Sequence, residues 1–199
     1  MAAGAAAELD ETLKAIRACR LCADGFSHAP RPIVQASGAA RIAIFGQAPG
    51  NLAHQSGRPF TDPSGVRLRD WLQVSEAAFY DPNTFVIAPM AFCFPGYDAN
   101  GGDLPPPKLC AETWRTRLLD AVGAVDLTLL VGGYAQKWTL AGRRKRTLTE
   151  TVRAWREYAP AIIPLPHPSW RNNRWLKDNP WFDAELLPHL RREVRRRVS

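Results

Sequence analysis

The stretch from Ile42 to Gly65 constrains the fold of this chain more than any other part of it. It begins with the apolar run Ile-Ala-Ile-Phe at 42–45, which is too short for a helix and rich in residues that favour strands. The sequence Gly-Gln-Ala-Pro-Gly at 46–50 then forms a turn, because proline fixes φ and glycine accepts backbone angles that other residues resist. A buried strand that ends in such a turn places backbone N–H groups at the carboxyl edge of a sheet, where open α/β sheets bind ligands. The alternative interpretation is a plain tight turn after a core strand.

Four short apolar runs predict strands, and helical patterns separate them. The predicted strands are Ile42–Phe45, Phe85–Ala88, Leu127–Val131 and Ile162–Leu165. The predicted helices are Leu9–Ala18, Val66–Val74, Cys110–Val122, Ala135–Leu140, Leu148–Tyr158 and Asp183–Arg196. Because strands alternate with helices, we expect an α/β fold, a three-layer α/β/α sandwich in which helices flank a central four-stranded parallel sheet. We expect residues 1–199 to form a single domain.

Composition limits the class of protein. A hydrophobic share of 46% in 199 residues is enough to build a core. No apolar run approaches the roughly 18 residues of a membrane span. The N-terminal residues also lack the basic-then-apolar pattern of a secretory signal, so we expect a cytoplasmic protein without a membrane partner. The net charge of +7 favours a polyanionic partner, although a solubilising surface would give the same excess.

The four cysteines are arranged as two pairs. Cys19 and Cys22 form C-x2-C, and Cys93 and Cys110 form C-x16-C after a long gap. A cytosolic chain seldom uses disulfides, so a metal or redox role is the first interpretation and four unrelated buried thiols are the alternative. Four thiolates suit a tetrahedral zinc ion or an iron–sulfur cluster, and the spacing alone does not choose between them. The second pair flanks the Gly/Pro-rich loop Phe94–Pro107, which a bound metal group would help to order.

Two strand ends carry the side chains of chemical interest. One is the turn at 46–50, and the other is His-Pro-Ser-Trp-Arg-Asn at 167–172. In a parallel sheet both lie at the same edge and face one pocket. This pair of motifs, in this order, resembles the uracil-DNA glycosylase superfamily. The cysteine pattern and the segment Gly-Arg-Pro-Phe-Thr-Asp-Pro-Ser-Gly at 57–65 look like the iron–sulfur-containing family 4 and family 5 branches, with a variant first motif.

The resemblance implies a monofunctional DNA-repair glycosylase that flips uracil, or another deaminated base, out of DNA and hydrolyses its N-glycosidic bond. The reaction leaves an oxocarbenium-like sugar, which needs negative charge and water, and a uracil anion, which needs hydrogen-bond donors. His167 is expected to donate to a uracil carbonyl, and Phe60 to stack on the flipped base; a surface histidine and ordinary core packing are the alternatives. The residues expected to contact the base or its flanking phosphate are Gly46, Gln47, Ala48, Pro49 and Gly50.

The chain departs from the superfamily pattern in two places. Several branches carry a carboxylate inside the first motif to position water, whereas this chain has Gln47 and Ala48 there. Asp62 matches the aspartate of the G-D-x-S-G-like segment if a one-residue gap is allowed. It is expected to orient water or stabilise the cation, and its alternative is a cap or turn before Pro63. Several branches also read uracil with an asparagine after the second strand. Here Ala-Pro-Met stands at 88–90, so base reading rests on backbone groups or on Gln47.

The resemblance also assigns the contacts with DNA. Small hydroxyl groups at tight turns bind phosphates and arginines add charge. The residues expected to do so are Ser64, Ser169, Arg171, Asn172 and Arg174. Trp170 or Arg171 is expected to fill the space left by the flipped base, and the alternative for Trp170 is packing against Trp175 or Trp181.

By the same resemblance, the cysteines hold a structural 4Fe-4S cluster, with zinc as the alternative. Two other functions stay open. The missing motif carboxylate would suit a weakly active or inactive protein of the same fold that binds uracil or abasic DNA. The cysteines alone would suit a metal-stabilised α/β protein of unrelated function, such as a small redox module. For the glycosylase we expect a monomer that acts in the cytoplasm, on the nucleoid, on single- or double-stranded uracil-containing DNA.

Overall fold

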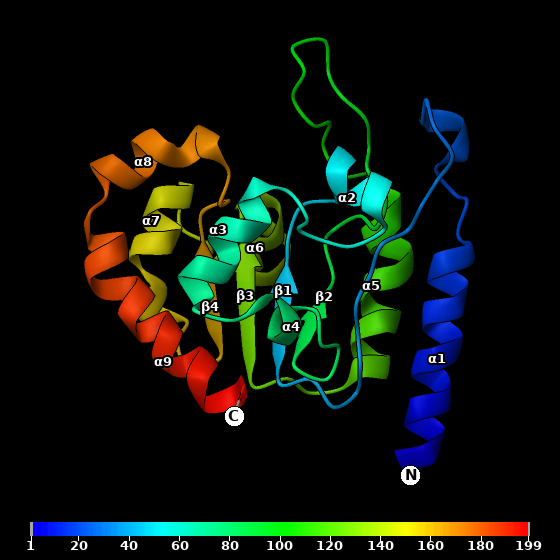
Figure 1. The fold of residues 1–199 in the computed structure, drawn as a ribbon, viewed down its shortest axis with the longest axis horizontal. Coiled ribbons are helices and arrows are strands. Elements are labelled where there is room, and N and C mark those ends of the chain that lie inside the picture. Colours follow the sequence, from blue (N-terminus) through cyan, green and yellow to red (C-terminus); the bar gives the residue numbers. More distant parts are fainter. Residues whose placement is uncertain (1, 199) are drawn as a thin grey trace.

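The computed structural model describes residues 2–198 and contains a four-stranded parallel sheet between helices (Figure 1). The strands run β2-β1-β3-β4 across the sheet, and every neighbouring pair is parallel. Their bounds are β1 Ile42–Phe45, β2 Phe85–Ile87, β3 Leu127–Val131 and β4 Ile162–Leu165. The predicted four-stranded parallel sheet is therefore confirmed, with β2 one residue shorter than expected.

Nine α-helices lie within residues 2–198. Their bounds are α1 Ala2–Ala18, α2 Asn51–Ser56, α3 Pro63–Leu72, α4 Glu76–Phe79, α5 Lys108–Val122, α6 Gly133–Leu140, α7 Leu148–Arg153, α8 Asn173–Asp178 and α9 Leu187–Val198. The helix predicted over 148–158 is divided, since α7 ends at Arg153 and a 3-10 turn covers Trp155–Glu157. A π-helical turn at Phe182–Leu186 leads into α9. None of these helices is long and apolar enough to cross a membrane.

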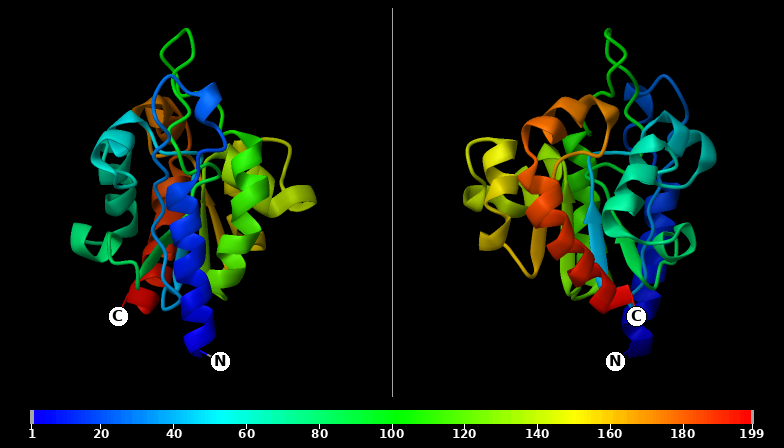
Figure 2. Two further views of the ribbon diagram at one scale, coloured as in Figure 1. Left: turned by 90° about the vertical axis from the view of Figure 1, so that its right-hand side faces the viewer. Right: turned by 60° about the vertical axis from the view of Figure 1, so that its left-hand side comes forward.

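Alternate side chains of each strand enter different helix layers. Ile42 and Ile44 of β1 join a core with residues of α3, α4, α7 and α9. Ala43 and Phe45 join a second core with residues of α1, α5 and α6. Figure 2 shows α1 and α5 together on one side of the sheet and α9 on the other. Because side chains alternate between the faces of a strand, the sheet separates two hydrophobic cores. The predicted three-layer α/β/α sandwich is confirmed.

The entrance to α3 is tightly constrained. Phe60 has a φ of +54°, in the left-handed region that residues other than glycine seldom adopt. Its carbonyl oxygen accepts hydrogen bonds from Arg69 Nη1 at 3.2 Å and from the Tyr80 hydroxyl at 3.1 Å, and these bonds hold the backbone in place. Gly65, in the first turn of α3, lies directly against the Phe60 backbone. Only glycine permits this approach, because a Cβ atom at 65 would overlap the Phe60 carbonyl.

We expect Gly65→Ala to destabilise the protein. The added methyl group would force the backbone between residues 60 and 65 to shift. Overpacking of this kind lowers the free energy of unfolding by about 2 kcal/mol or more. Urea denaturation followed by circular dichroism measures the change. Gly142→Ala is the matched control, because nothing lies within 4 Å of a Cβ built there, and its effect should stay below about 0.5 kcal/mol. Equal effects of the two substitutions would contradict this account of α3.

Candidate active site and candidate metal centre

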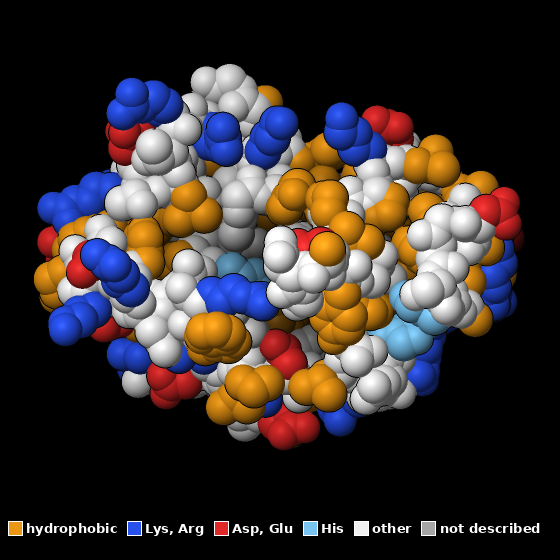
Figure 3. Space-filling view, turned by 90° about the horizontal axis from the view of Figure 1, so that it is seen from above, with side chains coloured by type: hydrophobic (Ala, Val, Ile, Leu, Met, Phe, Trp, Pro, Cys, Tyr) orange, Lys and Arg blue, Asp and Glu red, His pale blue; other side chains and the backbone are white. Residues whose placement is uncertain are grey.

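A pocket of about 60 Å³ lies at the carboxyl edge of the sheet. The neighbouring strands β1 and β3 are followed by helices on opposite faces of the sheet, since α3 packs in one core and α6 in the other. Such a switch point leaves a crevice where α/β proteins bind ligands. The lining residues are Gly46, Gln47, Ala48, Pro49, Gly50, Ala53, Pro59, Phe60, Asp62, Ser64, Ile87, Pro89, Asp103 and His167. Figure 3 shows this face hollowed, with histidine atoms in the hollow and Lys and Arg side chains around it. The fold thus brings the first-motif turn, Phe60, Asp62 and His167 to one cavity.

The turn after β1 is held from two directions. The Gly46 carbonyl accepts a hydrogen bond from the Met90 N–H at 2.9 Å, and the Gln47 carbonyl accepts one from the Ala91 N–H at 3.1 Å. Both donors belong to the segment that follows β2. The Gln47 side chain donates through Nε2 to the Leu104 carbonyl at 3.3 Å, in the long loop between β2 and α5. The turn is therefore a fixed wall of the pocket, and the Gln47 amide has a structural partner.

Phe60 forms the opposite wall of the pocket. A Cβ atom on Gly46 would lie 3.5 Å from Cζ of Phe60, so the tip of the ring reaches the turn. The ring meets Phe79 edge to face, with centroids 6.1 Å apart, and is half-buried. Phe60 packs against the core and also lines the cavity, and its stacking on a flipped base stays a prediction.

His167 follows β4 and rests against the end of β3. A Cβ atom on Gly132, which has a φ of +84°, would lie 3.7 Å from Cβ of His167. Asn172 fixes the histidine backbone, because its Nδ2 donates to the His167 carbonyl at 2.7 Å. Burial lowers the pKa of His167; Asp62 works against this change and Arg171 adds to it. The imidazole is therefore neutral near pH 7 and carries one N–H donor.

Asp62 lies at the start of α3 and at the wall of the pocket. It lines the pocket, and it also caps α3, since Oδ2 accepts a hydrogen bond from the Ser64 N–H at 3.2 Å. Pro63 occupies the first helical position, where its missing N–H costs nothing. Ser64 is 7% exposed, at the wall of the same pocket. One carboxylate oxygen of Asp62 is thus committed to the helix.

Asp103 is a pocket residue that the sequence analysis missed. It lies near the end of the loop Phe94–Pro107, and its Oδ2 would lie 3.7 Å from a Cβ atom built on Gly50. Asp103 is exposed as a whole residue. Partial enclosure of its carboxylate nevertheless raises its pKa; Arg171 opposes the rise and Asp62 adds to it. A loop without periodicity gives no signal for such a placement, because only the folded chain brings residue 103 to the turn after β1.

The aromatic candidate for filling the gap in DNA stands free of the core. Trp170 is 70% exposed, in the 3-10 turn after β4. The Arg171 guanidinium lies 5.4 Å from the centroid of its ring. Trp175 and Trp181 pack edge to face on each other instead, with centroids 5.7 Å apart. The structure therefore leaves Trp170 available for contacts outside the chain.

The other residues expected to bind DNA cluster beside it. Ser169 uses its carbonyl to accept a hydrogen bond from Arg67 Nη1 at 3.0 Å, which anchors the segment after His167 to α3. Asn172 holds the His167 carbonyl, as described above, so its amide is already engaged. Arg174 is exposed on α8 and lies 3.6 Å from Asp178. These positions agree with a DNA-facing surface next to the pocket, and their roles stay a prediction.

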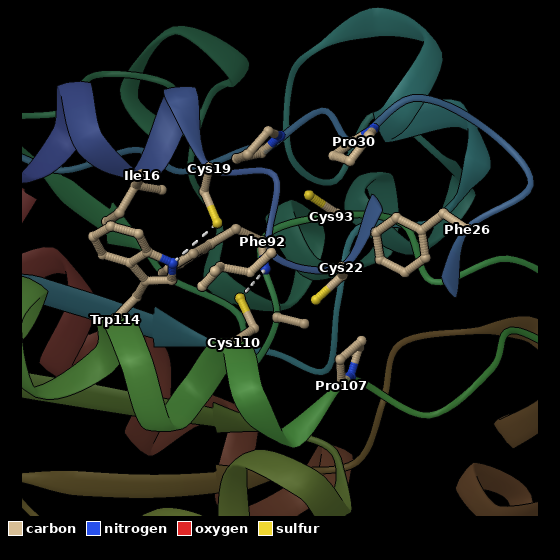
Figure 4. A pocket seen from close by; sticks show the side chains of 13 residues that line it. Ile16, Cys19, Cys22, Phe26, Pro30, Phe92, Cys93, Pro107, Cys110 and Trp114 are labelled. Carbon is tan, nitrogen blue, oxygen red and sulfur yellow. Dashed lines mark hydrogen bonds between the residues drawn. The ribbon is translucent and has the colours of Figure 1, made fainter. Parts of the chain in front are cut away.

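The four cysteines line one cavity on the α1 and α5 side of the sheet. Cys19 and Cys22 follow α1, Cys93 follows β2, and Cys110 lies in the first turn of α5. Figure 4 shows their sulfur atoms directed toward a common space. The side chains that close this space are Ile16, Leu21, Phe26, Pro30, Pro32, Ala91, Phe92, Pro107 and Trp114. Within residues 2–198, no three metal-binding side chains are already arranged as ligands of a metal ion.

The surroundings of the thiols suit a thiolate-bound group. Trp114 donates through Nε1 to Cys19 Sγ at 3.3 Å, and the Phe92 N–H donates to Cys110 Sγ at 3.4 Å. N–H donors to sulfur are a usual feature of iron–sulfur sites. Burial and the neighbouring thiols raise the pKa of Cys93 to about 12, so this thiol stays protonated without a metal. Convergent sulfurs with N–H donors fit a group that replaces the thiol protons.

Arg115 connects the cavity with the pocket. It is 1% exposed, and its Nη1 donates to the carbonyls of Ala88 at 2.9 Å and Pro89 at 3.2 Å, just after β2. The guanidinium lies 4.3 Å from the centroid of the Phe45 ring. Burial lowers the pKa of Arg115 to about 10, against the effect of nearby Cys110. Arg115 thus joins the helix that carries Cys110 to Pro89, which lines the pocket.

A comparison with known protein families matches residues 34–191 to the Uracil DNA glycosylase superfamily. The matched stretch runs from the residues before β1 into α9. It includes both strand-end motifs, and Cys19 and Cys22 precede it. Since the match covers well over half of the 199 residues, the chain belongs to the uracil-DNA glycosylase superfamily.

Proposed function

We propose that this protein is a monofunctional DNA-repair glycosylase that removes uracil from DNA by hydrolysis and leaves an abasic site. One observation carries the proposal: the first-motif turn, Phe60 and His167 line one pocket at the carboxyl edge of the sheet. Membership of the superfamily supports DNA as the substrate. A stacked base is out of reach of such a pocket, so the nucleotide must first rotate out of the helix.

The pocket supplies the two kinds of stabilisation that the reaction needs. When the bond between C1′ and N1 breaks, its electron pair stays on the base, and negative charge develops on a uracil carbonyl. The neutral His167 imidazole donates a hydrogen bond to this oxygen, and one such donor is worth about 10²- to 10³-fold in rate. The Asp62 carboxylate lies in the same pocket and stabilises the positive charge on the sugar. Phe60 stacks on the flipped base.

Selection of the base rests on backbone groups in this proposal. Pro89 lines the pocket just after β2, where several branches have asparagine. The Gln47 Nε2 group already donates to Leu104, which leaves its Oε1 atom for the base. A pocket with few side-chain donors and acceptors discriminates weakly between bases of similar shape. We therefore include other deaminated bases among the substrates.

Removal of uracil should depend on His167 and Asp62. We expect the wild-type protein to release uracil from single- or double-stranded uracil-DNA, detected as strand cleavage after alkali treatment. His167→Ala should lower the single-turnover rate about 10²-fold or more, because the anion loses its donor. Asp62→Asn should lower it as well while α3 stays capped, since asparagine caps helices well.

Asp126→Asn is the control for these variants, because Asp126 pairs with Arg41 on the surface and is not a pocket residue. Tight binding of uracil-DNA without release would instead support a binding protein of the same fold. A protein that neither binds uracil-DNA nor releases uracil would exclude both functions.

Trp170 should matter more for duplex than for single-stranded substrate. We propose that its exposed ring fills the gap that the flipped nucleotide leaves in the stack. A single strand has no such gap, so Trp170→Ala should slow excision from duplex at least about fivefold more than from single strands, since base–aromatic stacking is worth ~1–3 kcal/mol. Parallel single-turnover assays measure the ratio. Trp138→Ala, at another exposed aromatic residue outside the pocket lining, serves as the control. An equal loss on both substrates would refute the role.

The same proposal gives the cysteine cavity a 4Fe-4S cluster. Cys19, Cys22, Cys93 and Cys110 would hold it, and the convergence of their sulfurs is the supporting observation. When bound, the cluster would supply iron–thiolate bonds that join the end of α1 to α5 and to the segment after β2. The proposed role of the cluster is structural, because the residues that line the base pocket do not include the four cysteines. Zinc is the alternative group for four thiolates.

Protein purified without oxygen should be brown and contain iron, as expected of a cysteine-ligated cluster. Cys110→Ser should lose the iron and lower the melting temperature, because the loop before α5 loses its anchor. Leu109→Ala, at an exposed neighbouring position, should keep both properties. A colourless protein that contains zinc would show that the four cysteines bind zinc instead of a cluster. A protein that contains neither iron nor zinc would contradict the proposed metal centre.

Because the proposed substrate is DNA, we expect the protein in the cytoplasm, on the nucleoid. We also expect it to act as a monomer, which sedimentation measurements check directly.

A further inference from the structure

The loop that carries Asp103 is an ordered hairpin rather than a loose connection. Tyr97 and Asp103 form an antiparallel bridge, and the Leu104 N–H donates to the Gly96 carbonyl at 2.9 Å. At the tip, Asp98 Oδ1 accepts hydrogen bonds from the N–H groups of Asn100 and Gly102 at 2.8 and 2.9 Å. Figure 1 shows this hairpin, in green, projecting beyond the carboxyl edge of the sheet. Asp103 is therefore held at a defined place beside the pocket.

Gln47 joins the hairpin to the first motif. Its Nε2 donates to the carbonyl of Leu104, the residue next to Asp103, at 3.3 Å. The Asp103 carboxylate reaches the far end of the same turn, at Gly50. The residue that stands where several branches have a carboxylate thus holds a loop that brings a carboxylate from elsewhere in the chain.

The two pocket carboxylates differ in their freedom. Asp62 accepts a hydrogen bond from the backbone at the start of α3. Within residues 2–198, the carboxylate of Asp103 has no hydrogen-bond partner, and the charges of Arg171, Asp62 and Asp98 lie near it. It is also exposed, so a proton that it accepts can pass to solvent. A general base needs a free lone pair and a way to release its proton.

We propose that Asp103 is the general base that activates the water for attack on C1′, replacing the carboxylate that the first motif lacks. The inference rests on the proposed glycosylase function. In this step the bond between C1′ and N1 breaks and its electron pair stays on the base. The water oxygen forms a bond to C1′, and the water proton moves to the Asp103 carboxylate and from there to solvent. The uracil anion takes a proton from solvent after release. Gln47 is a positioning residue in this scheme.

The expected pH dependence follows from the surroundings of Asp103. Partial enclosure raises its pKa, Arg171 lowers it, and Asp62 and Asp98 raise it. Because the base must be ionised, the rate falls as the pH drops through this raised pKa, at a higher pH than for an ordinary aspartate. Asp103→Asn should abolish this fall of the rate at acidic pH and leave any pH dependence of the rate that arises from His167.

Single-turnover excision and DNA binding, measured on the same variants, test the proposal. Asp103→Asn should lower the excision rate about 10²-fold, within the usual range for a lost general base. Its dissociation constant for uracil-DNA should stay within about threefold of wild type or become smaller, because a negative charge near the phosphates is removed. Sodium formate should restore part of the rate of Asp103→Gly by supplying a small carboxylate. Gln47→Ala should lower the rate and respond less to formate.

Asp98→Asn is the matched control. It removes the same charge from the same hairpin, keeps an oxygen for the Asn100 and Gly102 bonds, and lies outside the pocket lining. Its excision rate should stay within about threefold of wild type. Asp103→Asn with more than a third of the wild-type rate would overturn the base and leave the glycosylase intact. Loss of DNA binding in Asp103→Asn would also overturn it. A wild-type protein that releases no uracil would overturn the proposed function and this inference together.

Discussion

The parallel pairing of β1, β3 and β4 decides where every candidate site residue lies. Phe45 is in register with Leu130, and Val131 is in register with Leu165, so the three strands end within one residue of one another. The turn after β1 and His167 are far apart in sequence, yet this register brings them to one edge. A shift of one residue in the pairing of a strand would move its side chains to the other face of the sheet, and thus from one core into the other. Backbone hydrogen bonds in the sheet therefore bring the turn after β1 and His167 together, and side-chain bonds to Leu104 and His167 hold them there.

The parts of the fold with a clear hydrophobic pattern could be predicted from the sequence. The pocket residues that directly follow these strands could be predicted as well. The four strands lie close to their expected bounds, because short apolar runs between Gly/Pro turns have few other structures available. The short helices α2, α4 and α8 were not predicted, since four to six residues give no helical period. Asp103 was missed for a related reason. Its place depends on a hairpin and a Gln47 contact that exist only in the folded chain.

The entrance to α3 shows how local strain and function meet at the pocket. Phe60 adopts a left-handed backbone conformation, and hydrogen bonds from Arg69 and Tyr80 to its carbonyl stabilise it. The same backbone path lets Gly65 pack closely and puts Asp62 at the helix cap. Residues held in rare conformations concentrate at ligand sites, because the surrounding structure must supply their cost. The two alternatives for Asp62, a cap and a pocket carboxylate, are therefore compatible.

A buried charge joins the helix that carries Cys110 to the segment after β2. The Arg115 side chain donates to Ala88 and Pro89, while its Nε and Nη2 atoms are buried without a partner in residues 2–198. An uncompensated buried cation is costly, and the Phe45 ring and two carbonyls compensate it only in part. The proposed cluster would add negative charge on the α5 side, next to Cys110. The Arg115 bonds would then join the helix that holds the proposed cluster to Pro89, which lines the base pocket.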